Sequence, residues 1–168
     1  ENSCTDMEIS QVIANKLDSY KKTQTGQKLP PFSLFDETRT LCNLNDLIGL
    51  SNYTLLFFGS SHCPFCQDSN PVLSLVSELN DFRSFKVIYI SFDTTQNELL
   101  MAKKSYGKKW IILSELKSWD SKLAQYLMIH KTPSFIMLDK TANIISKPKD
   151  LTALLAELSR LGIKKPAN

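Results

Sequence analysis

Two apolar, β-favouring runs separated by a helical stretch constrain the fold of this chain more than any other feature. The runs are YTLLFFG (Tyr53–Gly59) and FKVIYISFD (Phe85–Asp93). Both have the near-continuous apolar character of strands that are buried on two faces. Between them, apolar residues recur at the spacing of one helical face up to about Asn80. The order of strand, helix and strand predicts a parallel β-α-β unit.

The remaining segments extend this unit into a mixed sheet. After it, TTQNELLMAKKSYG predicts a helix that ends at Gly107, KKWIILS a strand, and SWDSKLAQYLMIH another helix. TPSFIMLDKTANIIS predicts two strands joined by a turn, and KDLTALLAELSRLG an amphipathic helix. Before the β-α-β unit, two alternating segments around a turn at Asp36–Arg39 predict a β-hairpin at a sheet edge. We therefore expect an α/β fold with a mixed central sheet and helices on both faces.

The N-terminal segment differs from the rest. Residues 1–25 are polar, with apolar residues at the spacing of an amphipathic helix that docks on another surface: Met7, Ile9, Val12, Ile13 and Leu17. We expect two units, a helical extension over 1–25 and an α/β domain over 26–168. The chain opens ENSCTDMEIS, without an initiator Met or the apolar core of a signal peptide. We expect a processed end, from which a signal sequence or membrane tether was removed.

Composition excludes several functional classes. The chain is 42% apolar and 22% charged, as is ordinary for a globular protein. Its net charge of +3 is small and its lysines occur in pairs rather than in a stripe, which does not indicate nucleic acid binding. No apolar run approaches the roughly 18 residues that span a membrane. The even number of cysteines, four, suits an oxidising compartment.

Two cysteines follow the first buried run at Cys-x-x-Cys spacing, in LLFFGSSHCPFCQDSNPVL. Cys63 would stand at the start of a helix, where unpaired backbone N–H groups and the helix dipole favour a thiolate. A thiolate is the nucleophile of disulfide exchange. Cys66, one turn further, can attack a mixed disulfide at Cys63 and release the partner. Pro64 suits the first helical turn, because its missing N–H would have no partner there.

Taken alone, the two cysteines allow three interpretations. They are half of a zinc site, an inert structural disulfide, or a pair that cycles between thiol and disulfide. A structural zinc ion takes four ligands, and the sequence has no second cysteine pair at finger spacing. The strand and helix around the motif favour the redox pair, and we expect neither a metal nor another cofactor.

The segment FFGSSHCPFCQDSNP resembles the active-site segment of the thioredoxin superfamily. Pro71, eight residues after Cys63, stands where that superfamily interrupts the helix with a proline. HKTPSFIMLDKTANI resembles the segment that faces the motif, which implies that Pro133 is the cis-proline and Thr132 the residue before it. An inserted helix and strand over about 95–114, with GQKLPPFSLFD ahead of the active-site strand, are similar to TlpA/ResA-type thiol-disulfide oxidoreductases. This resemblance covers about residues 26–162.

The resemblance implies a thioredoxin-like fold and a thiol-disulfide oxidoreductase outside the cytoplasm, typically in the bacterial periplasm. Members of this branch often reduce protein disulfides and are recycled by an upstream redox partner. This chain departs from the pattern at several positions that bear on redox potential or on the hairpin, and one departure is the Pro64-Phe65 dipeptide between the cysteines, which is not a common choice of this branch. Phe57 replaces the buried Asp of plain thioredoxins, His62 replaces a frequent Trp, and Arg39 replaces the usual Gly of the hairpin turn.

Several residues near the motif are candidates for tuning or substrate binding. His62, as an imidazolium, would favour the Cys63 thiolate. Phe65 would form an apolar docking surface, and Thr132 would present its backbone to a substrate strand. Cys4 and Cys42 are a candidate structural disulfide, with two unpaired thiols as the alternative.

The sequence leaves several functions open. We expect a reductant of the TlpA/ResA kind, with Cys63 attacking and Cys66 resolving. A dithiol oxidase and a disulfide isomerase are alternatives within the same chemistry. A binding module with locked cysteines and a metal-handling protein are alternatives of other classes.

Overall fold

The computed structural model describes residues 3–106 and 109–166, and the side chains from Ile9 onward within these ranges. Seven strands form one sheet in the order β2-β1-β5-β4-β3-β6-β7. At its centre, β3 (Tyr53–Gly59) pairs in parallel with β4 (Phe85–Ser91) and antiparallel with β6 (Ser134–Asp139). β5 (Ile111–Ser114) lies parallel to β4 on its other side. The predicted mixed sheet is confirmed.

Both edges of the sheet are antiparallel hairpins. β1 (Ser33–Asp36) and β2 (Leu41–Asn43) form the predicted N-terminal hairpin, and β7 (Ile144–Ser146) pairs with β6 at the other edge. Arg39 has a φ of 66° in the turn between β1 and β2. This left-handed conformation strains a residue with a Cβ atom, and it explains why a glycine suits the position better.

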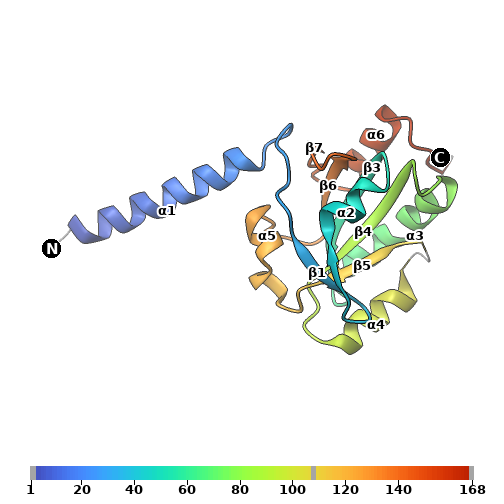
Figure 1. Cartoon of the computed structure of the whole chain (residues 1–168), viewed down its shortest axis with the longest axis horizontal. Helices are drawn as coiled ribbons and strands as arrows, with labels where there is room; N and C mark the ends of the chain where they lie inside the picture. The colour runs from blue at the N-terminus through green and yellow to red at the C-terminus, as the bar shows by residue number, and fades with distance from the viewer. Residues whose placement is uncertain (1–2, 107–108, 167–168) are drawn as a thin grey trace.

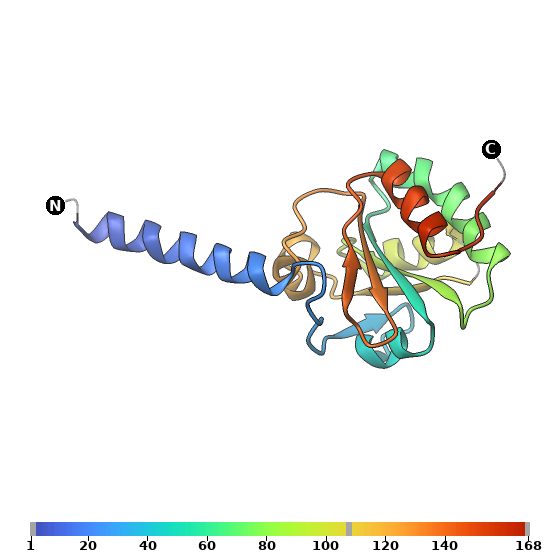
Figure 2. The same cartoon turned by 90° about the horizontal axis from the view of Figure 1, so that it is seen from above.

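Helices cover both faces of the sheet (Figures 1 and 2). One face packs against α3 (Pro64–Leu79), α4 (Gln96–Ser105) and α6 (Leu151–Arg160). The other packs against α2 (Leu44–Gly49) and α5 (Lys122–Tyr126). Each face has its own apolar core. This agrees with the sequences of the central strands, in which apolar residues are continuous rather than alternating with polar ones. The predicted end of α4 at Gly107 falls outside the described residues.

The expected helix over SWDSKLAQYLMIH is wrong in extent. The structure has a 3-10 turn, η1 (Ser118–Asp120), followed by the five-residue helix α5. Ser121 interrupts the segment, because its side chain accepts the Ala124 N–H and so begins a new helix. Met128, with a φ of 56°, prevents α5 from continuing.

Helix α1 (Ser3–Lys22) forms as predicted, but it does not dock on the domain. It projects away from the sheet and its covering helices (Figures 1 and 2). Its apolar residues Ile9, Val12, Ile13 and Leu17 are all more than half exposed. This apolar face is therefore open to another surface, and the expectation that it docks on one stays a prediction. None of the helices in the described ranges combines the length and the apolar content needed to cross a membrane.

Candidate active site

The two cysteines of the motif stand at the N-terminus of α3. Cys63 is the N-cap residue, and its Sγ accepts the Cys66 N–H at 3.2 Å. Pro64 occupies the first turn, where it removes no helical hydrogen bond. The sulfur atoms of Cys63 and Cys66 are joined in a disulfide. Cys63 is 6% exposed and Cys66 is fully buried, so only Cys63 is accessible to a partner.

The loop that precedes β6 faces the motif. The pairing of Phe58 with Ser134 brings the start of β6 beside the end of β3, where the cysteine loop begins. The peptide bond between Thr132 and Pro133 is cis. Thr132 and Pro133 share a shallow groove with Phe65 on α3. Phe65 is 69% exposed, which leaves its ring available for contact with a partner.

A second hollow lies on the other side of this loop. It is lined by Thr132 together with His62 and Trp119, among others. The Trp119 ring stacks on Phe92 with 4.5 Å between ring centroids. Thr132 therefore lies between two depressions, one of which contains Phe65 and the other His62. The structure thus brings together five of the predicted residues around Cys63: His62, Pro64, Phe65, Thr132 and Pro133.

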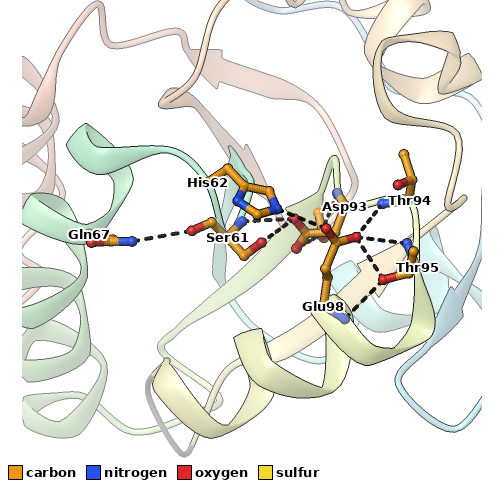
Figure 3. Close-up of polar contacts among 8 residues, drawn as sticks. Ser61, His62, Gln67, Asp93, Thr94, Thr95 and Glu98 are labelled. Atoms are coloured by element: carbon orange, nitrogen blue, oxygen red, sulfur yellow. Dashed lines mark hydrogen bonds and ion pairs between the residues drawn. The ribbon is translucent and has the colours of Figure 1, made fainter.

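His62 forms an ion pair that sequence reasoning missed. Its Nε2 lies 2.9 Å from Oε1 of Glu98, the third residue of α4 (Figure 3). The other Glu98 oxygen accepts the Thr95 N–H and hydroxyl within the capping box of α4. These hydrogen bonds, led by that from His62, lower the pKa of Glu98 to about 2. The Glu98 carboxylate in turn raises the pKa of His62 through its hydrogen bond and its charge.

Removing the Glu98 charge should lower the pKa of His62. Glutamine at position 98 keeps the capping box but not the carboxylate. In the unmutated protein, the raised pKa keeps His62 protonated to higher pH. In Glu98→Gln, His62 should therefore lose its proton, and with it the positive charge beside Cys63, at a lower pH. The NMR titration of the His62 ring measures this shift, and His130, the other histidine of the chain, is the internal reference. Glu78→Gln, an exposed change in α3, is the control. An unchanged His62 midpoint in Glu98→Gln contradicts the assignment.

A buried carboxylate fixes the loop that carries the cysteines. Asp93, only 2% exposed, follows β4 and accepts hydrogen bonds from the Ser61 N–H at 2.9 Å and the Ser61 hydroxyl at 2.8 Å (Figure 3). Its second oxygen accepts the Ser91 hydroxyl at 2.7 Å. These bonds tie the residues before Cys63 to β4. The sequence gives no signal for this contact, because Ser61 and Asp93 are 32 residues apart.

The other candidate residues lie away from the motif. Cys42 in β2 forms no disulfide with another cysteine whose side chain the structure describes, and burial raises its pKa. The side chain of Cys4 lies outside the described residues, so its pairing with Cys42 stays a prediction. Within the described part of the chain, no three His, Cys, Asp or Glu side chains form a group that could hold a metal ion.

Two curated relatives match most of the chain at low identity. Nucleoredoxin-like protein 1 of Homo sapiens is 26% identical over 121 residues, which cover 68% of this chain and 55% of the relative. The protein of the same name from Mus musculus is 26% identical over 134 residues, covering 76% of this chain and 59% of the relative. The chain thus spans little more than half the length of these relatives.

Solved structures share the fold. The thioredoxin domain of a thiol-disulfide oxidoreductase from Bacteroides vulgatus superposes with a TM-score of 0.70 at 20% identity, covering 84% of this chain and 99% of that one. A thiol-disulfide oxidoreductase from Bacteroides fragilis gives 0.69 at 25% identity, covering 80% and 99%.

A family model described as thioredoxin-like matches residues 51–144, which is more than half of the chain. The match includes β3, the Cys-x-x-Cys motif, the inserted α4 and β5, and the strand that follows Pro133. With this match, the cysteine geometry and the shared fold, the chain belongs to the thioredoxin-like family.

Proposed function

We propose that this thioredoxin-fold thiol-disulfide oxidoreductase acts as a reductant of disulfides in other proteins. The observation that carries the proposal is the unequal placement of the two sulfurs at one helix N-terminus. Cys63 caps α3 and reaches the surface, whereas Cys66 is buried one turn further in and bonded to it. This arrangement supports an attacking role for Cys63 and a resolving role for Cys66, both at the start of one helix.

The exchange proceeds in two steps. The Cys63 thiolate attacks one sulfur of the substrate disulfide, which forms a mixed disulfide and releases the other substrate sulfur as a thiolate. Cys66 then gives up its proton and attacks Cys63 Sγ. The Cys63–Cys66 bond forms, the mixed disulfide breaks, and the substrate leaves with two electrons. Cys66 supplies one of the two protons of the substrate thiols, and solvent supplies the other. An upstream dithiol partner then reduces the Cys63–Cys66 disulfide. The electrons reside in the cysteines, so we propose that no cofactor takes part.

The substrate segment would lie along the loop that holds Thr132 and Pro133. Pro133 has no N–H, and the Thr132 backbone lies between the Phe65 groove and the His62 hollow. We propose that an extended segment pairs with Thr132 as an added strand and rests an apolar side chain on Phe65. His62, held in its protonated form by Glu98, would favour the Cys63 thiolate at the moment of attack.

We further propose that the protein is a reductant of the TlpA/ResA kind and that it acts outside the cytoplasm. The inserted α4 and β5 support the first. The second draws on the thiol-disulfide oxidoreductases of Bacteroides that share the fold, and on the even number of cysteines.

Reduction of insulin by the protein, with dithiothreitol as electron source, tests the proposed function. We expect precipitation of the insulin B chain to begin well before it does with dithiothreitol alone, and Cys63→Ser to remove this acceleration. Without acceleration by the unmutated protein, the chain is better described as a binding module with locked cysteines.

The reduction potential of the cysteine pair tests the direction of electron flow. A value near thioredoxin's roughly −270 mV supports a reductant, and one near roughly −120 mV indicates an oxidase.

A further inference from the structure

The structure places a pair of tyrosines beneath the buried cysteine. Tyr89 of β4 and Tyr106, which follows α4, share a hydrogen bond of 3.1 Å between their hydroxyls. Tyr89 is fully buried, and Tyr106 is 7% exposed. Their rings pack with 4.5 Å between centroids. Phe57, which replaces the buried Asp of plain thioredoxins, packs edge-on against the Tyr89 ring and has no polar atom to offer.

Gly59 allows the Tyr89 hydroxyl to approach Cys66. A Cβ atom on Gly59 would lie 2.7 Å from Tyr89 Oη and 3.0 Å from Cys66 Sγ. The Tyr89 hydroxyl and the Cys66 sulfur therefore both border the space that a side chain at position 59 would occupy. A larger residue at position 59 would occupy this space and separate the two groups.

Cys66 needs a polar partner when it reacts. It must become a thiolate to attack the mixed disulfide, yet burial among apolar groups disfavours that charge. The titratable groups buried in the same core cluster are Cys63 at the start of α3, Tyr89 from β4 and Tyr106 beyond α4. The Asp93 carboxylate at the end of β4 adds its negative charge, but its oxygens are engaged by Ser61 and Ser91. The other buried residues of this core cluster are apolar, among them Phe57, Trp110 and Phe135.

We propose that Tyr89, oriented by Tyr106, donates a hydrogen bond to the Cys66 thiolate during the resolving step, in place of the buried acid that this chain lacks. The inference rests on the proposed function and adds a residue to it. Hydrogen bonds to charged groups are stronger than neutral ones, so a single donor lowers the barrier to forming this thiolate.

The tyrosine stabilises the thiolate but does not take its proton. Burial raises the pKa of both Tyr89 and Tyr106, so both phenols stay neutral and act only as donors. The proton of Cys66 leaves with the departing substrate thiolate. The new bond joins Cys66 to Cys63, and the electron pair of the broken mixed disulfide goes to the substrate sulfur. No further reactant is required.

Reaction of the reduced protein with one equivalent of Ellman's reagent separates the two steps. Attack by Cys63 releases the first thionitrobenzoate, and resolution by Cys66 releases the second. In Tyr89→Phe we expect an unchanged first phase and a second phase about tenfold slower near neutral pH. The deficit should shrink as the pH rises past about 8.5, where solvent base deprotonates an ordinary thiol. Tyr106→Phe should show a smaller effect of the same kind. Tyr53→Phe, a half-buried tyrosine at the far end of β3, is the control.

Two outcomes overturn the inference while leaving the proposed function intact. One is a second phase in Tyr89→Phe with the rate and pH profile of the unmutated protein. The other is a second phase slowed equally at every pH, which indicates disturbed packing rather than a lost hydrogen bond. If the unmutated protein releases no second thionitrobenzoate, the proposed function itself fails, and the inference fails with it.

Discussion

Cys66→Ser should turn the protein from a turnover reductant into a covalent trap for its substrates. Cys63 keeps its place at the N-terminus of α3 and still attacks a disulfide, but serine cannot complete the second exchange. The mixed disulfide therefore accumulates to about one substrate molecule per protein molecule. Catalytic turnover of insulin falls to the rate given by dithiothreitol alone.

Non-reducing electrophoresis and mass spectrometry of the Cys66→Ser protein measure the trapped adducts. Because Cys4 and Cys42 are the other cysteines of the chain, the substitution is made in a Cys4→Ser, Cys42→Ser background. Adding Cys63→Ser to these changes should remove the adducts. Adducts that persist in the absence of Cys63 would show that another thiol reacts and would contradict the assignment of Cys63 as the attacking residue.

The reacting residues and the central strands could be predicted because their signals are local. A continuous apolar run defines β3 and β4, and the placement of Cys63 before a helical stretch determines its position as the helix cap. The segment around Pro133 needed the resemblance to a known family, since nothing in its composition indicates that it faces the cysteines. The start of β6 then follows from the antiparallel register with β3.

Other parts of the site depend on contacts between distant residues. His62 and Glu98 are 36 residues apart, and Tyr89 and Tyr106 are 17 apart. No spacing rule relates such positions, because their contact follows from how α4 packs on the sheet. The position of α1 depends on distant residues in the same way. Its apolar spacing predicts a helix, but the helices that cover the two sheet faces are α2 to α6, and spacing alone does not identify the surface on which α1 docks.

Phe57→Ala should destabilise the protein more than any other single truncation near the site. The Phe57 ring is fully buried at the centre of β3, with its centroid 5.2 Å from that of Tyr89, 5.8 Å from that of Trp110 and 5.3 Å from that of Phe135. Truncation leaves a cavity among three large rings that cannot all close in. Such changes cost about 3–5 kcal/mol of unfolding free energy. Denaturant unfolding of the reduced protein measures this loss, because the disulfide then makes no contribution.

Phe65→Ala is the matched control, since it removes the same atoms from a ring that is 69% exposed on the same side of the sheet. It should change the unfolding free energy by less than about 0.5 kcal/mol, and should weaken only the binding of substrate. A loss below about 1 kcal/mol in Phe57→Ala would mean that the aromatic cluster repacks around the gap. The core beneath Cys66 would then be adaptable rather than rigid. A rigid core matters for the chemistry because Phe57 supports the ring of Tyr89, and a shifted Tyr89 hydroxyl would no longer border the same space beside Gly59 as the Cys66 sulfur.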